Sequence, residues 1–448
     1  MDSENYFSSR YLTIVGHVQS GKTYEEMNYC FASVKRGFPV FFITRNITAD
    51  QLQLNARFIE FNKTLKKPLD VFLLSHNDVS SIAKRMESPC IIILLCNQFQ
   101  LKKVKNVLYM YKGEYNVCID EVDFAIKTKY GTSELDTMLN QIKEGANHIL
   151  GATATPIAVF TTQKEMGKII KIKPTKNYHG VNSLNIEMIE SSITSDPATD
   201  HESIYKIYSS LLDKHSAVLL HTVTKKKKNH ESLMEYISDL FPTFTYIIYN
   251  GDGIQVLCKG RNDTPFTRPK SINQYGQFIN KYHYNNDIHH FFNYSIAEVL
   301  QILVDDYHQH THISIFAGQL ASRGVSFVST DYSLHLTDQY FHAGKLTHGE
   351  NYLQSLRILG CYKDNPILTL WCSEHSWKLI LDHNKIINSL VESVEGCTKW
   401  LQKIKKVIIN KPETPLSRPK IVSKVRRISK SHFFSLDISS DEEEEEIF

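Results

Sequence analysis

The sequence predicts an α/β protein with two successive domains, each built on a parallel sheet flanked by helices. Three observations support this prediction: two series of short apolar runs, amphipathic stretches between the runs, and a polar break between the two series. Apolar runs of this length are typical of parallel strands, because such strands are buried on both faces. The chain has 448 residues, enough for two or three domains with sizeable cores.

The candidate strands set the expected domain boundaries. The first series lies at 11–15, 40–44, 71–75, 91–95, 116–120 and 148–153. The second series lies at 217–222, 244–250, 312–318, 332–336 and 367–372. The polar segment 193–203 separates the two series. We therefore expect a first domain over residues 1–190 and a second over 203–375.

Three further segments differ from this pattern. Residues 254–295 form a polar, aromatic-rich insert in the second domain, which is typical of a functional loop or a mobile excursion. Residues 376–409 have apolar positions at three-to-four spacing, which predicts a helical extension. Residues 410–448 are basic and then end in an acidic run. Like charges repel there and few apolar groups are available for burial, so we expect a disordered tail.

The composition favours a soluble intracellular protein, in the cytoplasm or the nucleus. Hydrophobic residues make up 42% and charged residues 22% of the chain, as in ordinary globular proteins. The eight cysteines form no CxxC pair, and the polar N-terminus has no signal-peptide pattern. No apolar run approaches the ~20 residues of a membrane span, so we expect no membrane partner. The net charge of +3 does not identify a partner.

The segment 16–23, GHVQSGKT, fits the phosphate-binding P-loop pattern. It follows a candidate strand and precedes an amphipathic stretch, which is the context that the motif needs. Backbone N–H groups of such a loop surround phosphate oxygens at a helix N-terminus. Lys22 would reach the β- and γ-phosphates of ATP, and the Thr23 hydroxyl would bind Mg²⁺. The other residues expected around the phosphates are Gly16, His17, Val18, Gln19, Ser20 and Gly21.

A pair of carboxylates follows the candidate strand at 116–120, in the segment VCIDEVDF. The carboxyl ends of parallel strands meet at one edge of the sheet, where the P-loop also lies. We therefore expect Asp120 to hold Mg²⁺. We expect Glu121 to orient or deprotonate an attacking water.

With these two motifs, several segments together resemble the motifs of the superfamily-2 helicases. The similar segments are 41–53 for motif Ia, 120–123 for motif II, 151–156 for motif III, 318–327 for motif V and 354–361 for motif VI. Their order and spacing match, and they span the chain up to about residue 375. The loop GHVQSGKT, the segment SRGVSF and the Gln-x-x-Arg-x-x-Gly form most resemble the Z-one domain helicases and their relatives in phages and large DNA viruses.

The resemblance implies two tandem RecA-like P-loop domains with ATP and Mg²⁺ in the cleft between them. The second domain would reach the nucleotide with Gln354 and Arg357, and Arg357 would act as an arginine finger. Arg323 would contact the nucleotide or help to close the cleft. Thr153 and Thr155 would relay nucleotide hydrolysis to movement of the domains.

One departure from the family concerns the end of motif VI. Many members carry a second arginine after the glycine of this motif, whereas here Cys361, Tyr362 and Lys363 follow Gly360. A lysine ammonium lacks the bidentate geometry of a guanidinium. The departure therefore concerns the rate of hydrolysis more than its existence.

Nucleic-acid contacts are expected at the ends of strands. Arg45 and Gln51 lie where motif Ia of the family meets the phosphodiester backbone, and Asn97 follows another strand in the same way. Lys225 and Lys226 belong to a run of four lysines that suits a backbone-tracking patch. A solvated loop is the alternative interpretation of that run.

The expected function is that of an ATP-dependent helicase or translocase acting on nucleic acid, with DNA favoured over RNA. Resemblance suggests genome replication, transcription or processing of a large DNA virus in an infected host cell, with the tail binding replication or processing proteins. Two alternatives stay open. One is a duplex-DNA motor subunit of a packaging or restriction-type complex, and the other is a nucleic-acid-binding scaffold whose ATPase has decayed.

Overall fold

The computed structural model describes most of the chain up to residue 392. The described residues are 3–122, 134–154, 167–172, 174, 176–190, 200–222, 227–258, 281–285, 288–292, 294–306, 311–318, 321, 325–343, 349–361 and 366–392. No helix in these ranges has both the length and the apolar character required to span a bilayer. The expected tail at 410–448 lies outside them.

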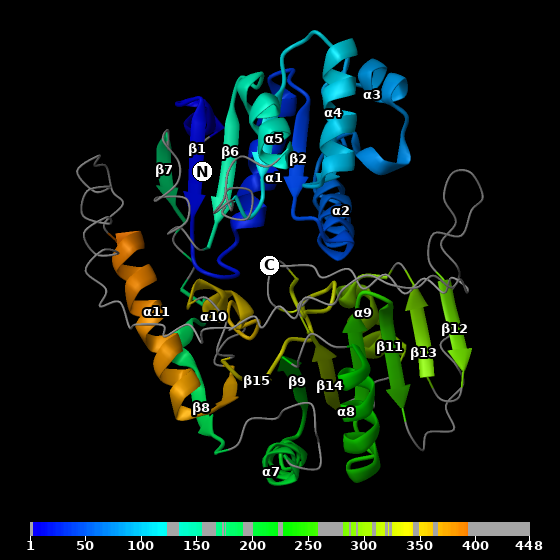
Figure 1. The fold of residues 1–448 in the computed structure, drawn as a ribbon, viewed down its shortest axis with the longest axis vertical. Coiled ribbons are helices and arrows are strands. Elements are labelled where there is room, and N and C mark those ends of the chain that lie inside the picture. The colour runs from blue at the N-terminus through cyan, green and yellow to red at the C-terminus, as the bar shows by residue number, and fades with distance from the viewer. Residues whose placement is uncertain are drawn as a thin grey trace, which may run out of the picture. The chain divides into compact units, whose positions relative to one another are not determined.

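The first sheet has seven strands in the order β3-β4-β2-β5-β6-β1-β7 (Figure 1). The strands are β1 (Tyr11–Val15), β2 (Val40–Thr44), β3 (Val71–Leu73), β4 (Ile91–Leu95), β5 (Asn116–Ile119), β6 (Ile149–Thr153) and β7 (Lys168–Lys171). Every pairing in this sheet is parallel, as the continuous apolar runs predicted. The edge strand β7 was not predicted.

Helices cover both faces of the first sheet. They are α1 (Lys22–Lys35), α2 (Thr48–Lys63), α3 (Val79–Arg85), α4 (Gln98–Met110) and α5 (Glu134–Glu144), with short 3-10 helices at Ser3–Phe7 and Leu74–His76. Residues of β4 alternate between the two faces, because successive side chains of a strand point in opposite directions. Ile92 joins the apolar cluster under α3, α4 and α5, whereas Ile91 joins the cluster under α1 and α2.

The second sheet has nine strands in the order β12-β13-β11-β10-β14-β9-β15-β16-β8. The strands are β8 (Asn185–Met188), β9 (Ala217–Thr222), β10 (Thr245–Asn250), β11 (Gly253–Cys258), β12 (Lys281–Asn285), β13 (Ile288–Phe292), β14 (His312–Ala317), β15 (Asp338–Phe341) and β16 (Thr369–Cys372). The pairings from β10 to β8 are parallel, and β11, β13 and β12 extend the sheet antiparallel.

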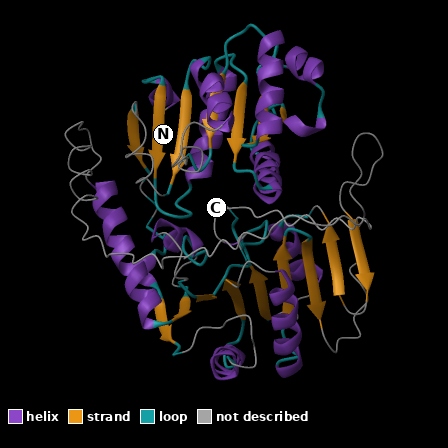
Figure 2. Cartoon of the chain, in the orientation of Figure 1, coloured by secondary structure: helices purple, strands orange, loops and turns teal. Residues whose placement is uncertain are grey.

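Helices also cover both faces of the second sheet (Figure 2). They are α7 (His201–Leu212), α8 (Lys227–Leu240), α9 (Ile296–Asp306), α10 (Gly349–Ser355) and α11 (Glu374–Glu392), with a 3-10 helix at Val181–Ser183. Helices α7 and α8 pack on one apolar cluster of the sheet, and α9, α10 and α11 pack on the other. Helix α11 is the described part of the helical extension expected at 376–409.

The predicted strand at 332–336 is wrong, because the chain turns there and the strand β15 begins only at Asp338. The backbone amide of Tyr332 donates a hydrogen bond to the Ser329 carbonyl at 3.0 Å. Tyr332 has a φ of 62°, which no strand residue adopts, and its side chain is 65% exposed. Asp331 fixes the turn by accepting hydrogen bonds from the Ser329 hydroxyl and the Ser333 amide.

The ends of the polar insert and the start of the second sheet also differ from expectation. The insert was predicted to be a loop or an excursion, but its described ends form β11, β12 and β13. The residues between β11 and β12 lie outside the described ranges. Residues 185–188, placed in the first domain by the sequence, form β8 and pair with β16 of the second sheet.

His221 in β9 is a buried histidine in the core of the second sheet. Its ring stacks on those of Tyr208 and Phe316, with centroid distances of 5.6 and 5.0 Å. Its Nε2 shares a hydrogen bond of 2.7 Å with the Tyr208 hydroxyl. Burial lowers the pKa of His221 from 6.5 to about 3, so the imidazole is neutral in the folded protein.

The free energy of unfolding should therefore fall as the pH drops below 6.5, because the unfolded chain binds a proton that the folded chain excludes. From pH 6.5 to about pH 5 this residue should remove about 2 kcal/mol. His221→Phe should abolish that share of the pH dependence. Denaturant unfolding of both proteins near neutral pH and near pH 5 measures it. Equal pH dependence in the two proteins would contradict the assignment.

Candidate functional site

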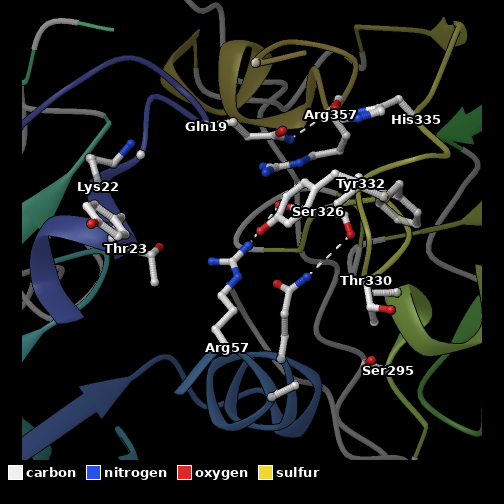
Figure 3. Close-up of a pocket in the computed structure, with 18 of the residues that line it drawn as sticks. Gln19, Lys22, Thr23, Arg57, Ser295, Ser326, Thr330, Tyr332, His335 and Arg357 are labelled. Carbon is white, nitrogen blue, oxygen red and sulfur yellow. Dashed lines mark hydrogen bonds between the residues drawn. The ribbon is translucent and has the colours of Figure 1, made fainter. Parts of the chain in front are cut away.

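A cavity of about 1000 Å³ is lined by residues from both sheets' helices and loops (Figure 3). From the first domain come α1, α2, the loop after β1 and the loop after β5. From the second come the start of α9, the segment 326–336 and the segment 354–361. Polar and charged side chains of both domains line the cavity. They include Gln19, Lys22, Thr23, Arg57, Asp120, Glu121, Ser326, Gln354 and Arg357.

The P-loop joins β1 directly to α1, in the strand–loop–helix order that the motif requires. Gly21 precedes the helix with a φ of 89°, a conformation that favours glycine. A Cβ on Gly16 would lie 2.6 Å from the Ser20 hydroxyl oxygen and 3.3 Å from the Ile172 Cβ, so a larger residue would require these side chains to shift. The Lys22 ammonium is folded back on the loop and donates to the His17 carbonyl at 2.8 Å. Burial lowers the pKa of Lys22.

The two predicted carboxylates lie at the carboxyl end of β5, where both line the cavity. Burial raises the pKa of Asp120 to about 7, and the Glu121 and Asp50 carboxylates act in the same direction. Glu121 has a φ of 51°, in the left-handed region that non-glycine residues seldom adopt. Its carboxylate accepts a hydrogen bond from the Gln354 side chain at 3.2 Å. Backbone strain of this kind is concentrated at functional sites.

Arg357 reaches the cavity from the segment that follows α10. It is 6% exposed, and its Nη1 donates to the Gln354 carbonyl at 2.7 Å. Its Nε has no hydrogen-bond partner among the described residues. Burial lowers the pKa of Arg357 to about 10, although the nearby Glu121 carboxylate opposes that shift. A buried guanidinium with a vacant donor indicates a place for an anion.

Gly360 allows the P-loop to approach the second domain closely. Its φ is 78°, and a Cβ on it would lie 2.4 Å from the Gln19 Cβ. The Gln19 side chain in turn donates to the Arg357 carbonyl at 3.0 Å. The loop after β1 is therefore in direct contact with the segment 357–360.

The cations and carboxylates of this cavity are not paired with one another. Lys22, Arg57 and Arg357 line it, and no carboxylate of the described residues lies within salt-bridge distance of any of the three. Asp120 and Glu121 line the same cavity. Holding partly buried charges apart is unfavourable unless a ligand compensates them. The arrangement fits a polyanion bound together with a metal cation.

Two of the lining residues suit a magnesium ion. The Thr23 hydroxyl and the Asp120 carboxylate supply oxygen atoms, which are the ligands that Mg²⁺ prefers. In the part of the chain that the structure describes, no group of three or more His, Cys, Asp or Glu side chains is placed to hold a metal ion. The protein oxygens would therefore supply only part of the coordination shell, as is usual for magnesium bound with phosphates.

The residues predicted to couple hydrolysis to movement are placed only in part. Thr153 ends β6 and is fully buried, and its carbonyl accepts the Gly16 amide at 3.3 Å. It therefore lies directly against the start of the P-loop. Thr155 and Arg323 lie outside the described residues.

Two predicted nucleic-acid residues are buried rather than presented on the surface. Arg45 is 5% exposed and forms an ion pair of 2.6 Å with Asp50. Gln51 is 4% exposed, and its side chain donates to the Ile93 carbonyl at 3.4 Å. The chain enters α2 immediately after β2, which turns both side chains into the packing of the first domain.

The other predicted nucleic-acid residues have different outcomes. Asn97 lies at the end of β4 as expected, and its side chain accepts the Gln100 amide at 2.8 Å, which caps α4. Its amide group donates to the Asn46 side chain. Lys225 and Lys226 lie outside the described residues.

Two residues of α2 that the sequence did not single out also line the cavity. The Arg57 Nη2 donates to the Ser326 hydroxyl at 3.0 Å, and the Gln53 side chain donates to the Ser326 carbonyl at 3.4 Å. Both join the first domain to the segment resembling motif V. Their spacing of four places them on one helix face, but that pattern alone does not reveal a contact with a residue so distant in the sequence.

No protein-family model matches the sequence, and no curated protein matches it. Among solved structures, the DEAD-box helicase Mss116 bound to ssRNA and UDP-BeF is 12% identical with a TM-score of 0.51, covering 91% of this chain and 79% of Mss116. Dbp5 from S. cerevisiae bound to RNA and ADP BeF3 is 11% identical with a TM-score of 0.50, covering 89% of each chain.

The helicase MrfA bound to DNA and AMPPNP is also similar, at 10% identity and a TM-score of 0.52. The match covers 86% of this chain and 50% of MrfA, so this chain spans about half the length of that protein. At such identities the likeness concerns the fold. The chain has the two-domain α/β fold of these solved structures, as its motifs predicted.

Gly360→Ala should destabilise the protein more than Gly37→Ala. Both glycines have a positive φ, but a Cβ at Gly37 meets nothing within 4 Å, whereas a Cβ at Gly360 collides with Gln19. Gly37→Ala therefore measures backbone strain alone, about 1 kcal/mol, and any excess at Gly360 measures the P-loop contact. Denaturant unfolding gives both values. Equal losses would show that the contact contributes nothing.

Proposed function

We propose that the protein is an ATP hydrolase that works as a nucleic-acid helicase or translocase. The observation that carries the proposal is the cavity at the P-loop, where cations of both domains and the Asp120 and Glu121 carboxylates face one space with no salt bridge between them among the described residues. A nucleoside triphosphate with Mg²⁺ carries the charges that would compensate both sets. The likeness to helicases solved with nucleic acid and nucleotide analogues supports the same reading.

Lys22 and the P-loop amides would hold the β- and γ-phosphates. Thr23 and Asp120 would hold Mg²⁺, which supplies charge neutralisation at the phosphates when bound. Glu121 would orient the attacking water and accept its proton, with Gln354 fixing the carboxylate through their hydrogen bond. Arg357 would stabilise the charge that develops on the γ-phosphate, with its vacant Nε as a donor.

Movement along nucleic acid would follow from opening and closing of the cleft. The Gln19 contact with Arg357 and the Thr153 contact with Gly16 join the nucleotide site to both domains. Thr155 and Arg323 are proposed to take part in the same change, and Lys225 and Lys226 to track the backbone. We propose DNA as the preferred track, in replication, transcription or processing of a viral genome, on the resemblance to helicases of large DNA viruses.

Hydrolysis by the purified protein tests the proposal, measured alone and with single-stranded DNA, duplex DNA or RNA. One polymer should stimulate hydrolysis. Lys22→Ala, Glu121→Gln and Arg357→Ala should each lower the rate by about 100-fold or more, because each removes a contact to the transition state. Lys67→Ala, which removes one exposed charge away from the cavity, should leave the rate unchanged.

Stimulation by duplex DNA without strand separation would identify the translocase as a duplex motor. One result would contradict the proposal. Hydrolysis no faster than that of the three variants under every condition would identify a nucleic-acid-binding scaffold, whose binding Lys22→Ala would not change.

A further inference from the structure

Arg57 is the lining cation that the motifs do not explain. It lies in the middle of α2 and projects into the cavity that also holds Lys22, Thr23 and Arg357 (Figure 3). Its Nη2 donates to the Ser326 hydroxyl at 3.0 Å. A guanidinium has five N–H donors in a rigid fork, so the rest of the Arg57 fork stays available for a planar or tetrahedral oxyanion.

Arg57 and Arg357 approach one another as like charges. Burial is the main cause that lowers the pKa of Arg357, and the positive charges of Arg45 and then Arg57 act in the same direction. No carboxylate of the described residues lies within salt-bridge distance of either guanidinium. Glu121 offsets part of the positive charge at Arg357, and an anion between the two guanidiniums would relieve the like-charge repulsion that is left.

The end of motif VI offers no second guanidinium. Cys361 follows Gly360 there, and the nearest basic residue, Lys363, lies outside the described residues. Helix α2 instead brings Arg57 to the same cavity from the first domain. A single chain therefore supplies two guanidiniums to the site, one from each domain.

We propose that Arg57 is a second phosphate-binding guanidinium of the nucleotide site, directed at the terminal phosphate opposite Arg357. The proposal rests on the proposed function, since it takes a nucleoside triphosphate as the ligand. Arg57 also bonds Ser326 of the second domain, so phosphate bound to Arg57 would help to hold the domains closed. The substrate feature that Arg57 recognises is the polyphosphate and not the base or the ribose.

Binding of inorganic tripolyphosphate with Mg²⁺ separates phosphate recognition from base recognition. In the full chain, Arg57→Ala should weaken binding of tripolyphosphate and of ATP by about tenfold or more, because a charge-assisted, bidentate contact is lost. Arg57→Lys should restore part of the affinity, since it keeps the charge without the fork. Lys67→Ala should bind as the wild type does.

Ser326→Ala distinguishes phosphate binding from a purely structural bond between the domains. It removes the hydroxyl partner of Arg57 and keeps the guanidinium, so it should change tripolyphosphate affinity far less than Arg57→Ala does. The proposal is overturned if Arg57→Ala binds tripolyphosphate as tightly as the wild type, or if Ser326→Ala reproduces its defect. If Lys22→Ala also leaves binding of ATP unchanged, the proposed nucleotide site itself fails.

Discussion

The arrangement of the candidate site depends on cations and carboxylates that line one cavity without pairing with one another. Lys22, Arg57 and Arg357 lie on its walls with Asp120 and Glu121, yet none of the cations that the structure describes forms a salt bridge with either carboxylate. Partly buried charges in a folded protein are normally paired, because desolvation is expensive. Packing elsewhere must offset that cost. A bound ligand with separated charges of its own would relieve it, as the proposed nucleotide and its metal ion would.

Unusual backbone conformations occur around the cavity that these charges line. Gly21 and Gly360 adopt positive φ values that glycine tolerates, and Gln19 and Glu121 adopt such values without being glycine. In this conformation the Glu121 carboxylate accepts a hydrogen bond from Gln354, and Gln19 packs against Gly360. Residues of each domain therefore contact residues of the other. The two buried sheets act as the rigid supports, since their strand ends carry the loops.

The sequence was most informative where one local pattern determines one local structure. Strands β2 and β4 are fully buried, and their uninterrupted apolar runs predicted them within a residue. The P-loop and the carboxylate pair were found because their glycines and acids occupy fixed positions next to strands. The family resemblance then brought Gln354 and Arg357 to the same site, and the structure places both there.

The predictions were weaker where side-chain partners decide the outcome. The segment 332–336 has the alternation of a strand, but hydrogen bonds to Asp331 turn it instead. Arg45 was expected to contact nucleic acid from its place after a strand, but Asp50, five residues later, pairs with it in the interior. Arg57 had no local signal at all, because its role arises only when α2 meets Ser326, which is distant in the sequence.

The cavity is expected to bind the phosphates of its ligand. The most direct test is the thermal midpoint of unfolding, measured with Mg²⁺ and equal concentrations of ATP, ADP or AMP. A ligand that binds only the folded state raises this midpoint according to its affinity. ATP should raise it most, ADP less and AMP least, because each phosphate lost removes partners of the cations. Equal shifts with all three nucleotides, or no shift with any, would contradict this expectation.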